Sequence, residues 1–359
     1  MKNIIKDFKN KTNILLADGA TGTNFFASGL QPGDPPELWN LQKPSDVINL
    51  HKEFISAGAN IILTNSFGAN SCRLKFHNIE KMSSEINISA AQLSKKAITS
   101  MQKCDEVMIG GSIGPTGEIF KSNGGNFTYE EAVDVFYQQA VSLKKGGVDF
   151  LWIETLSSLE EIDAAQSAAD KAGIGTVVTM SFDTAKRTMM GVTPKQFIHF
   201  FKNRTIKPLA VGANCGVGPS ELLLSMKEIK DNLDKKSLLV AKGNCGIPQY
   251  QSGKISYSGT KSIMIKYAIL CDLLGVDIIG GCCGTTPEHI KAIKNSFVKK
   301  NEYFRKYNFY KNHLLDEDYF RDLTIKEIGR PWKNISDVEK PLNNQFRKRR
   351  RGSKFKNNL

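Results

Sequence analysis

Residues 276–290 read VDIIGGCCGTTPEHI. The apolar, β-branched run at the start is typical of a strand that is buried on both faces. Two glycines, two adjacent cysteines and a third glycine follow it. Thr286 as a cap and Pro287 as a first helical residue then indicate the start of a helix. The stretch therefore predicts a strand, a turn and a helix, with two thiols at the carboxyl end of the strand.

Seven similar apolar runs precede this one at fairly regular intervals. The eight runs are ILLADGA (14–20), NIILTNS (60–66), VMIGGSIG (107–114), VDFLWIET (148–155), GTVVTMSFD (175–183), PLAVGANC (208–215), SLLVAKGN (237–244) and VDIIGGCC (276–283). Stretches with helical spacing lie between them, and Gly58, Gly146 and Gly275 stand where three such helices should stop. Eight alternating units predict an α/β fold of the (β/α)₈ TIM-barrel type, which usually takes about 250 residues. A doubly wound open sheet is the alternative, and the regular spacing favours closure.

The chain divides into three parts by composition. Residues 1–298 hold the eight units and would form the barrel. Residues 299–341 are aromatic and charged, and predict a helical or irregular extension. Residues 342–359, LNNQFRKRRRGSKFKNNL, carry seven Lys and Arg residues and no acid, within a net charge of +13. Such a run could bind RNA or a membrane surface, but charge runs are common on solvated tails. We therefore expect a disordered tail and no nucleic-acid partner.

Targeting and redox signals are few. No apolar run approaches the roughly 18 residues that span a bilayer, and the N-terminal apolar stretches are too interrupted for a secretory signal. The seven cysteines are an odd number in a long chain, which does not suggest a disulfide framework. We expect a cytoplasmic protein whose cysteines bind metal, act in catalysis or are buried.

Cys282 and Cys283 can reach one site only where the strand ends and the backbone turns. Cys215, at the end of another predicted strand, would complete three ligands. Three protein ligands with an open fourth position are typical of catalytic zinc, and sulfur ligands suit Zn²⁺. Such a site suits holding an incoming thiol as a thiolate. The alternatives are small buried residues beside a glycine turn, or a strained vicinal disulfide.

The other cysteines and the histidines give weaker signals. Cys72, Cys104 and Cys271 fall in or beside predicted helices, where we expect them to be core residues. Cys245 follows a predicted strand and is a weaker ligand candidate. His289 falls in the first turn of a predicted helix, and we interpret it as a helix residue and not as a ligand.

Two carboxylates also stand at strand ends. Asp18 precedes the glycine-rich turn DGATGTN, and Glu154 interrupts an apolar run. A buried acid either pairs with a base or faces a ligand, and strand ends in barrels surround the active site. The pair could bind an α-amino group. The alternatives are a helix cap for Asp18 and a structural ion pair for Glu154.

The motifs DGATGT, ILTNSFGAN, GANCGVGP and GGCCGTTPEHI, spread over residues 12–298, resemble the homocysteine S-methyltransferase family. Its members are zinc-dependent (β/α)₈ barrels that methylate homocysteine to methionine. PPELWN, WIET, FDTAKRTMMG and KGNCGIP look most like the bacterial betaine–homocysteine methyltransferases. The barrel is also similar to the homocysteine-binding module of cobalamin-dependent methionine synthase. The chain lacks the cobalamin motif D-x-H-x-x-G, so a complete cobalamin enzyme is excluded.

The resemblance implies roles for residues by position. Cys215, Cys282 and Cys283 match zinc ligands, and Asn244 matches a residue that can take the fourth position in an empty enzyme. Asp18 and Glu154 would act on homocysteine in the catalytic site. The substrate site implied is Asp18, Gly19, Ala20, Thr21, Ser66, Glu154 and Trp39.

The resemblance implies a positively charged methyl donor, such as glycine betaine. Aromatic faces hold onium groups, and Trp39 is the candidate, with Phe67 and Trp152 behind it. Animal betaine enzymes have tyrosines where this chain has Gly68 and Thr155, so a betaine cage would be built differently. Dimethylsulfoniopropionate and S-methylmethionine are alternative donors. A split methionine synthase subunit with a separate cobalamin protein is another alternative. The sequence leaves a homo-oligomer open.

Overall fold

Eight parallel strands form one sheet in the computed structural model, which describes residues 3–10, 14–251, 254–299 and 316–329. The strands are β1 (Leu15–Leu16), β2 (Ile61–Leu63), β3 (Met108–Ile113), β4 (Phe150–Leu156), β5 (Thr176–Met180), β6 (Ala210–Cys215), β7 (Leu238–Gly243) and β10 (Ile278–Gly281). Seven of them lie within an apolar run predicted above, and β4 extends one residue beyond the run at 148–155. Their order in the sheet is β1-β10-β7-β6-β5-β4-β3-β2.

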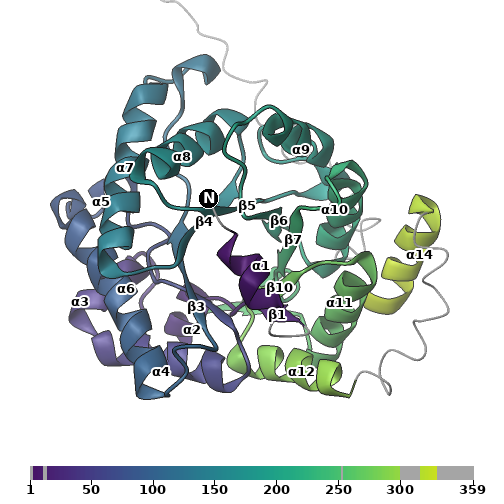
Figure 1. Cartoon of the computed structure of the whole chain (residues 1–359). Coiled ribbons are helices and arrows are strands. Elements are labelled where there is room, and N and C mark those ends of the chain that lie inside the picture. Colours follow the sequence, from purple (N-terminus) through teal and green to yellow (C-terminus); the bar gives the residue numbers. More distant parts are fainter. Residues whose placement is uncertain (1–2, 11–13, 252–253, 300–315, 330–359) are drawn as a thin grey trace, which may run out of the picture.

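Contacts between the first and last strands of this order, β1 and β2, close the sheet into a barrel. Ala17 bridges to Ile61 in parallel, and the Asp18 amide donates to the Ile61 carbonyl at 3.0 Å. The predicted (β/α)₈ barrel is therefore confirmed. Helices surround it (Figure 1). The helices are α1 (Ile4–Lys9), α2 (Gly22–Ala27), α3 (Trp39–Gln42), α4 (Pro44–Ser56), α5 (Ser71–Lys75), α6 (Ser83–Ser100), α7 (Tyr129–Gly146), α8 (Leu159–Ala172), α9 (Pro194–Lys202), α10 (Pro219–Asn232), α11 (Lys261–Leu274), α12 (Pro287–Val298) and α14 (Glu317–Ile328).

Local sequence signals set the helix ends. Thr128 and Glu131 form a capping box at the start of α7, and Gly147 in the left-handed conformation ends it, one residue after the expected stop. Thr286 caps α12 and Gly275 ends α11, as predicted.

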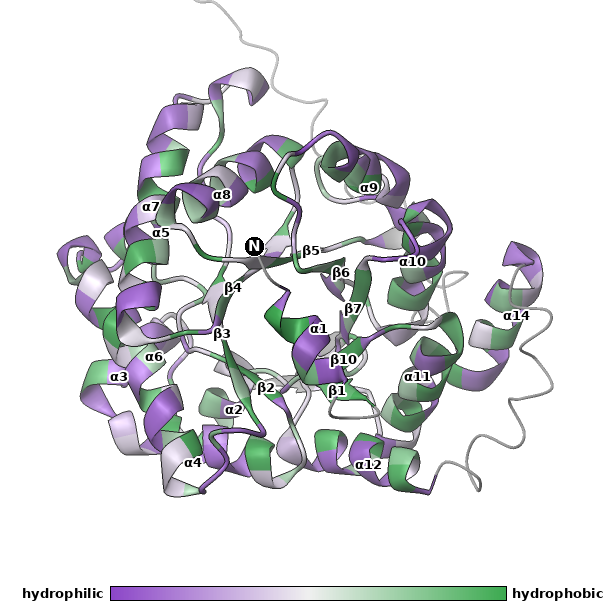
Figure 2. Cartoon of the chain, viewed as in Figure 1, coloured by the Kyte–Doolittle hydropathy of each residue, from purple (hydrophilic) through white to green (hydrophobic). Residues whose placement is uncertain are grey.

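The strands bury side chains on both faces. On β4, Phe150 and Trp152 lie in the barrel interior, whereas Leu151 and Ile153 pack against the helices. Glu154 continues the inward series at the carboxyl end of the strand. Hydrophobic residues accordingly follow the strands, and the helices are mixed (Figure 2).

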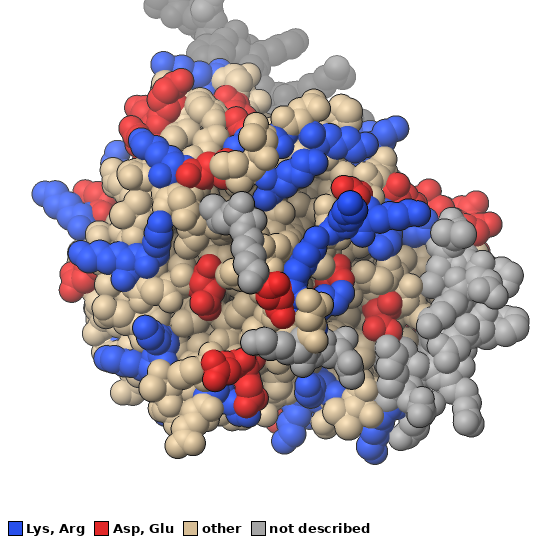
Figure 3. Space-filling view, viewed as in Figure 1, with Lys and Arg blue, Asp and Glu red and all other residues tan. Residues whose placement is uncertain are grey.

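The amino-terminal end of the barrel is covered by α1, which lies across the opening in Figure 1. Ile5 is fully buried in the interior cluster, and the Asn3 side-chain amide donates to the Leu209 carbonyl at 2.9 Å. On this face the Lys and Arg side chains of the described residues alternate with acidic ones (Figure 3). The carboxyl-terminal end of the barrel, opposite α1, is therefore the end that is available for an active site.

Two further elements are outside the eight units. A hairpin of β8 (Pro248–Gln251) and β9 (Lys254–Tyr257) lies between β7 and α11. Helix α14 falls within residues 299–341, and the Lys266 ammonium donates to its Glu327 carbonyl at 2.9 Å. Of the predicted extension, the structure describes Lys299 and residues 316–329. Residues 300–315 and 330–341, and the whole predicted tail at 342–359, lie outside the described residues. Among the described helices, none has the length and apolar character that crossing a bilayer requires.

Candidate functional site

Three cysteines from two strand ends meet at the carboxyl-terminal end of the barrel. The sulfur atoms of Cys215, Cys282 and Cys283 all lie within 4.8 Å of one another. Cys215 is the last residue of β6, and the other two directly follow β10. The convergence expected from the sequence is thus present in the structure.

Unusual backbone conformations aim these thiols at one point. Cys215 has a φ of +60°, in the left-handed region that few residues other than glycine adopt, and Gly284 has a φ of +77°. The Thr285 amide donates to the Cys282 carbonyl at 3.0 Å, so the chain turns tightly after β10. Strain of this kind often marks functional sites.

Asn244, which follows β7, joins the two thiol-bearing loops. Its amide nitrogen donates to the Gly216 carbonyl at 2.6 Å, and its oxygen accepts from the Cys283 amide at 3.0 Å. Both ends of the side-chain amide are therefore used to hold the thiol loops in place.

The three thiols fit a soft divalent cation. The hydrogen bond with Cys215, and then burial, raise the pKa of the Cys282 thiol well above its usual range, although Cys283 acts in the opposite direction. Without a cation the group is therefore protonated at neutral pH. A divalent metal ion would favour the thiolates, and a set of three sulfur ligands suits zinc.

The remaining cysteines divide between core and surface. Cys271 is fully buried in α11, as expected. The expectation that Cys104 is a core residue is wrong, because it lies exposed in the turn before β3, and Cys72 in α5 is only half-buried. Cys245 is buried 3.5 Å from Nε2 of His289, outside the cysteine trio. His289 sits in the first turn of α12 and bonds Thr286, as predicted for a helix residue.

The turn after β1 is attached to the turn that carries the thiols. The Ala20 amide donates to the Thr285 carbonyl at 3.2 Å, and the Asn24 side chain donates to the same oxygen at 3.0 Å. A side chain at Gly19 would place its Cβ 2.4 Å from that oxygen, so only glycine fits there. Thr21, at the start of α2, is half-buried beside this turn.

Asp18 and Glu154 share the end of the barrel with a lysine. The Lys242 ammonium donates to Oδ1 of Asp18 at 2.7 Å, and the Leu63 amide donates to Oδ2 at 2.8 Å. Asp18 is therefore not a helix cap. Glu154 accepts from the Ser112 hydroxyl at 2.6 Å. Burial raises the pKa of Glu154, and Lys242 opposes that shift.

Ser66 and Trp39 lie near this end but are both packed. The Ser66 hydroxyl donates to the Ser112 carbonyl at 2.7 Å and is fully buried. The Trp39 ring is only 5 % exposed and packs against Phe25, with the ring centres 4.8 Å apart and the ring planes tilted by 36°. The Lys43 ammonium lies 4.2 Å from the centre of the Trp39 ring, so a cation already occupies that face. Trp152 is buried inside the barrel, with Lys242 5.4 Å from its ring.

The sequence reasoning missed two residues of this region. One is Lys242, which stands in an apolar run near a strand end. The other is Tyr257, on β9, whose ring leaves no room for a Cβ at Gly284. Burial, and then Cys283, raise the pKa of the Tyr257 hydroxyl. Tyr257 stands in the stretch YSGT (257–260), which the pattern of apolar runs does not mark.

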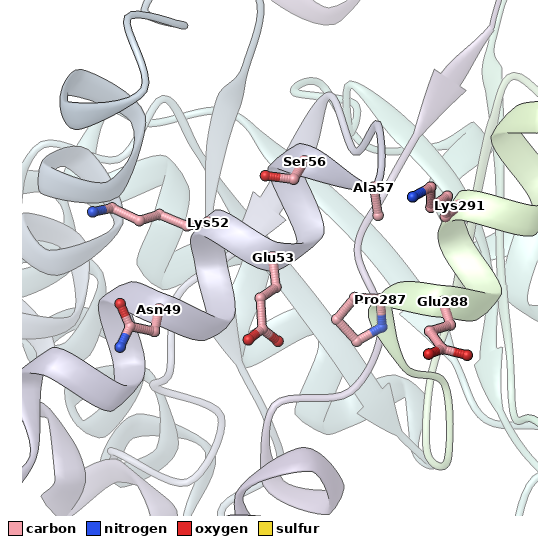
Figure 4. Close-up of a pocket in the computed structure, with 8 residues that line it drawn as sticks. All are labelled: Asn49, Lys52, Glu53, Ser56, Ala57, Pro287, Glu288 and Lys291. Carbon is pink, nitrogen blue, oxygen red and sulfur yellow. The ribbon is translucent and has the colours of Figure 1, made fainter.

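Grooves elsewhere on the molecule lack this chemistry. One lies on the outside of the barrel between α4 and α12 (Figure 4). Its lining residues are Asn49, Lys52, Glu53, Ser56, Ala57, Pro287, Glu288 and Lys291. It includes none of the expected site residues, and its charged side chains carry both signs.

Comparison with known proteins identifies the family of this chain. The family model for homocysteine S-methyltransferases matches residues 15–297. The chain is similar in structure to the homocysteine methyltransferase MmuM of Escherichia coli in its metallated form, with a TM-score of 0.67 and 21 % identity over 81 % of this chain and 99 % of that one. The apo form of MmuM gives 0.62 and 20 % over 80 % and 97 %. Since the family match covers most of the chain, this protein belongs to the homocysteine S-methyltransferase family.

Proposed function

We propose that this protein is a zinc-dependent enzyme that transfers a methyl group from glycine betaine to homocysteine, giving methionine and dimethylglycine. The observation that carries the proposal is the meeting of three cysteine thiols with Asp18 and Glu154 at one end of the barrel. The described cysteines form no disulfide, which suits a reducing compartment such as the cytoplasm.

Cys215, Cys282 and Cys283 would hold the zinc ion. When bound, zinc supplies the charge that keeps the homocysteine sulfur as a nucleophilic thiolate at neutral pH. Asn244 orients two of the ligand loops, since its amide bonds both of them. For a fourth-ligand role in the empty enzyme, Asn244 would use the second lone pair of the oxygen that accepts from the Cys283 amide.

The carboxylates bind the other end of the substrate. Asp18 and Glu154 together attract the α-ammonium group, and Gly19, Ala20 and Thr21 form the adjoining turn. Ser66 supports this wall through its bond to the Ser112 carbonyl. The substrate is thereby oriented with its sulfur toward the thiol trio, which is the kind of positioning that accelerates a two-reactant step.

The chemical step needs no proton from the protein. The sulfur electron pair forms a bond to one methyl carbon of betaine, and the C–N bond electrons stay on nitrogen. The leaving group is therefore a neutral tertiary amine, and the product is a thioether. The residues of the chain are required to bind and orient the two substrates and to exclude water.

The oxygen of Asn244 that holds Cys283 provides a first test of the metal centre. Asn244→Ala removes both bonds to the ligand loops, and we expect a loss of about 10- to 100-fold in zinc affinity, as for other residues that orient ligands. Competition with a chromogenic chelator measures it. Asn70→Ala is the matched control, because Asn70 bonds the Pro115 carbonyl at another strand-end loop. Equal zinc affinity in the two variants would contradict the orienting role.

Trp39 can serve the onium group only by exchange with Lys43. Lys43→Gln frees the ring face, and we expect the KM for betaine to fall by about 2- to 5-fold, in line with an exposed cation–π contact of roughly 0.5–1 kcal/mol. Lys171→Gln is the control, since Lys171 lies 4.5 Å from the Tyr137 ring far from the site. An unchanged KM in Lys43→Gln would make Trp39 a packing residue and leave Tyr257 as the aromatic face beside the thiols.

The test of the function is methionine formation from homocysteine by the zinc-loaded protein. Glycine betaine, dimethylsulfoniopropionate, S-methylmethionine and methyltetrahydrofolate are offered separately as donors. We expect turnover with betaine and an equal amount of dimethylglycine. Turnover with a sulfonium alone would keep the site and change the donor. If the protein binds zinc and homocysteine but forms no methionine with any donor, it would be a subunit that needs a cobalamin protein.

A further inference from the structure

A buried lysine lies among the carboxylates of the candidate site. Lys242 is 2 % exposed, and its ammonium group lies 2.7 Å from Oδ1 of Asp18. Lysine is almost never fully buried unless it is paired. Burial opposes the charge, but Asp18 and Glu154 outweigh it, so the pKa of Lys242 lies above its usual value. The lysine is therefore a permanent cation inside the barrel.

The carboxylate oxygens of Asp18 and Glu154 differ in their hydrogen bonds. Asp18 is fixed on both oxygens, by Lys242 and by the Leu63 amide. Glu154 is fixed on Oε1 by the Ser112 hydroxyl. Among the described residues, no hydrogen bond reaches its other oxygen, Oε2. Two carboxylates and one ammonium leave a single negative charge, and the free oxygen belongs to Glu154.

We propose that Lys242 is a positioning residue that fits this site to one ammonium group of an amino-acid substrate. It holds Asp18 in place and cancels one of the two carboxylate charges, so that the site attracts a single α-ammonium group. Asp18, Glu154, Lys242 and that ammonium group then carry no net charge among them. The inference rests on the proposed function. It also predicts poor binding of thiols that lack the amino group, because the remaining charge would then stay buried and unpaired.

Variants that remove the charge of Lys242 or of Asp18 test this balance between one ammonium and two carboxylates. Lys242→Met leaves two adjacent carboxylates, and Asp18→Asn leaves Lys242 to neutralise Glu154. We expect each single variant to raise the KM for homocysteine by about 10- to 100-fold, as for other broken buried charge pairs, with kcat within a few-fold. The double variant restores one negative charge on Glu154. We expect its KM to be at least about 10-fold lower than that of Asp18→Asn, which is the non-additivity of coupled residues.

Lys227→Met is the matched control. Lys227 is also a buried lysine, with its ammonium 2.5 Å from Asp231, but it lies on α10 away from the site. We expect lower thermal stability and an unchanged KM. Zinc content is measured for every variant. If Lys242→Met does not fold, the double variant, which removes the whole pair and is easier to tolerate, still gives the comparison with Asp18→Asn.

The outcomes separate this inference from the proposed function. A wild-type protein that neither binds nor methylates homocysteine would overturn both. A normal wild type with an unchanged KM in Lys242→Met would overturn the role of Lys242 alone. A double variant whose KM rises by the product of the two single effects would also overturn charge balancing, and would indicate that the lysine contacts the substrate directly.

Discussion

Replacing Cys282 by serine is expected to empty the metal site and stop the reaction. The zinc content should fall from about one ion per chain to near zero after dialysis, because a serine hydroxyl stays protonated where a thiolate is needed. Loss of a direct ligand should cost more than the roughly 10- to 100-fold in affinity seen for orienting residues. Methionine formation should fall below detection. Atomic absorption and a methionine assay measure the two effects.

Cys104→Ser is the control for this experiment. Its thiol is exposed and lies outside the trio, so zinc content and turnover should match those of the wild type. Circular dichroism should show the same helix content in both variants, since the strand order and the helices do not depend on the Cys282 sulfur. Zinc and activity retained in Cys282→Ser would contradict the ligand set.

The barrel and the thiol trio were predictable because they depend on a repeated pattern. Each parallel strand is buried on both faces, so all eight appear as apolar runs in the sequence. In a closed barrel the carboxyl ends of all strands share one face. Cys215 and Cys282 are far apart in sequence, yet topology alone brings them together. Gly284 and the following turn explain why two adjacent thiols can face one point.

Lys242 could not be predicted in the same way. It lies next to the end of an apolar run, where a lysine would ordinarily reach solvent. Its partner Asp18 is 224 residues away, and the two meet only because β7 and β1 both neighbour β10. Only the closed barrel turns this surface-like residue into an interior cation.

Trp39 and Tyr257 show a second limit. The motif PPELWN suggested an open aromatic face, but Phe25 and Lys43 cover it. The Phe25 contact arises from tertiary packing, whereas Lys43 follows Trp39 by four residues, at the end of α3. The hairpin that carries Tyr257 is too polar to appear as a strand in a search for apolar runs. Residues of the donor side therefore depend on loops, whose packing follows no periodic pattern.

Replacing Glu154 by glutamine is expected to weaken homocysteine binding without removing the site. Glutamine keeps the size of the side chain and an oxygen for the Ser112 hydroxyl, but it loses the charge that faces the α-ammonium. A buried charge contact of about 2–3 kcal/mol corresponds to roughly 30- to 150-fold in kcat/KM. The contact is the same in ground and transition states, so the KM should rise while kcat stays within a few-fold. Steady-state kinetics with homocysteine at saturating betaine measures this.

Glu161→Gln controls for the loss of a buried carboxylate as such. Glu161 is also buried, and it accepts from the Thr116 amide and hydroxyl at 2.8 and 2.7 Å, but it belongs to α8 outside the thiol region. Its KM for homocysteine should equal that of the wild type. The sharper comparison uses 4-mercaptobutyrate, which is homocysteine without the amino group. If Glu154 reads the ammonium, the wild type should prefer homocysteine strongly and Glu154→Gln should lose most of that preference. A preference that survives the substitution would mean that Asp18 and the β1 turn recognise the amino group without Glu154.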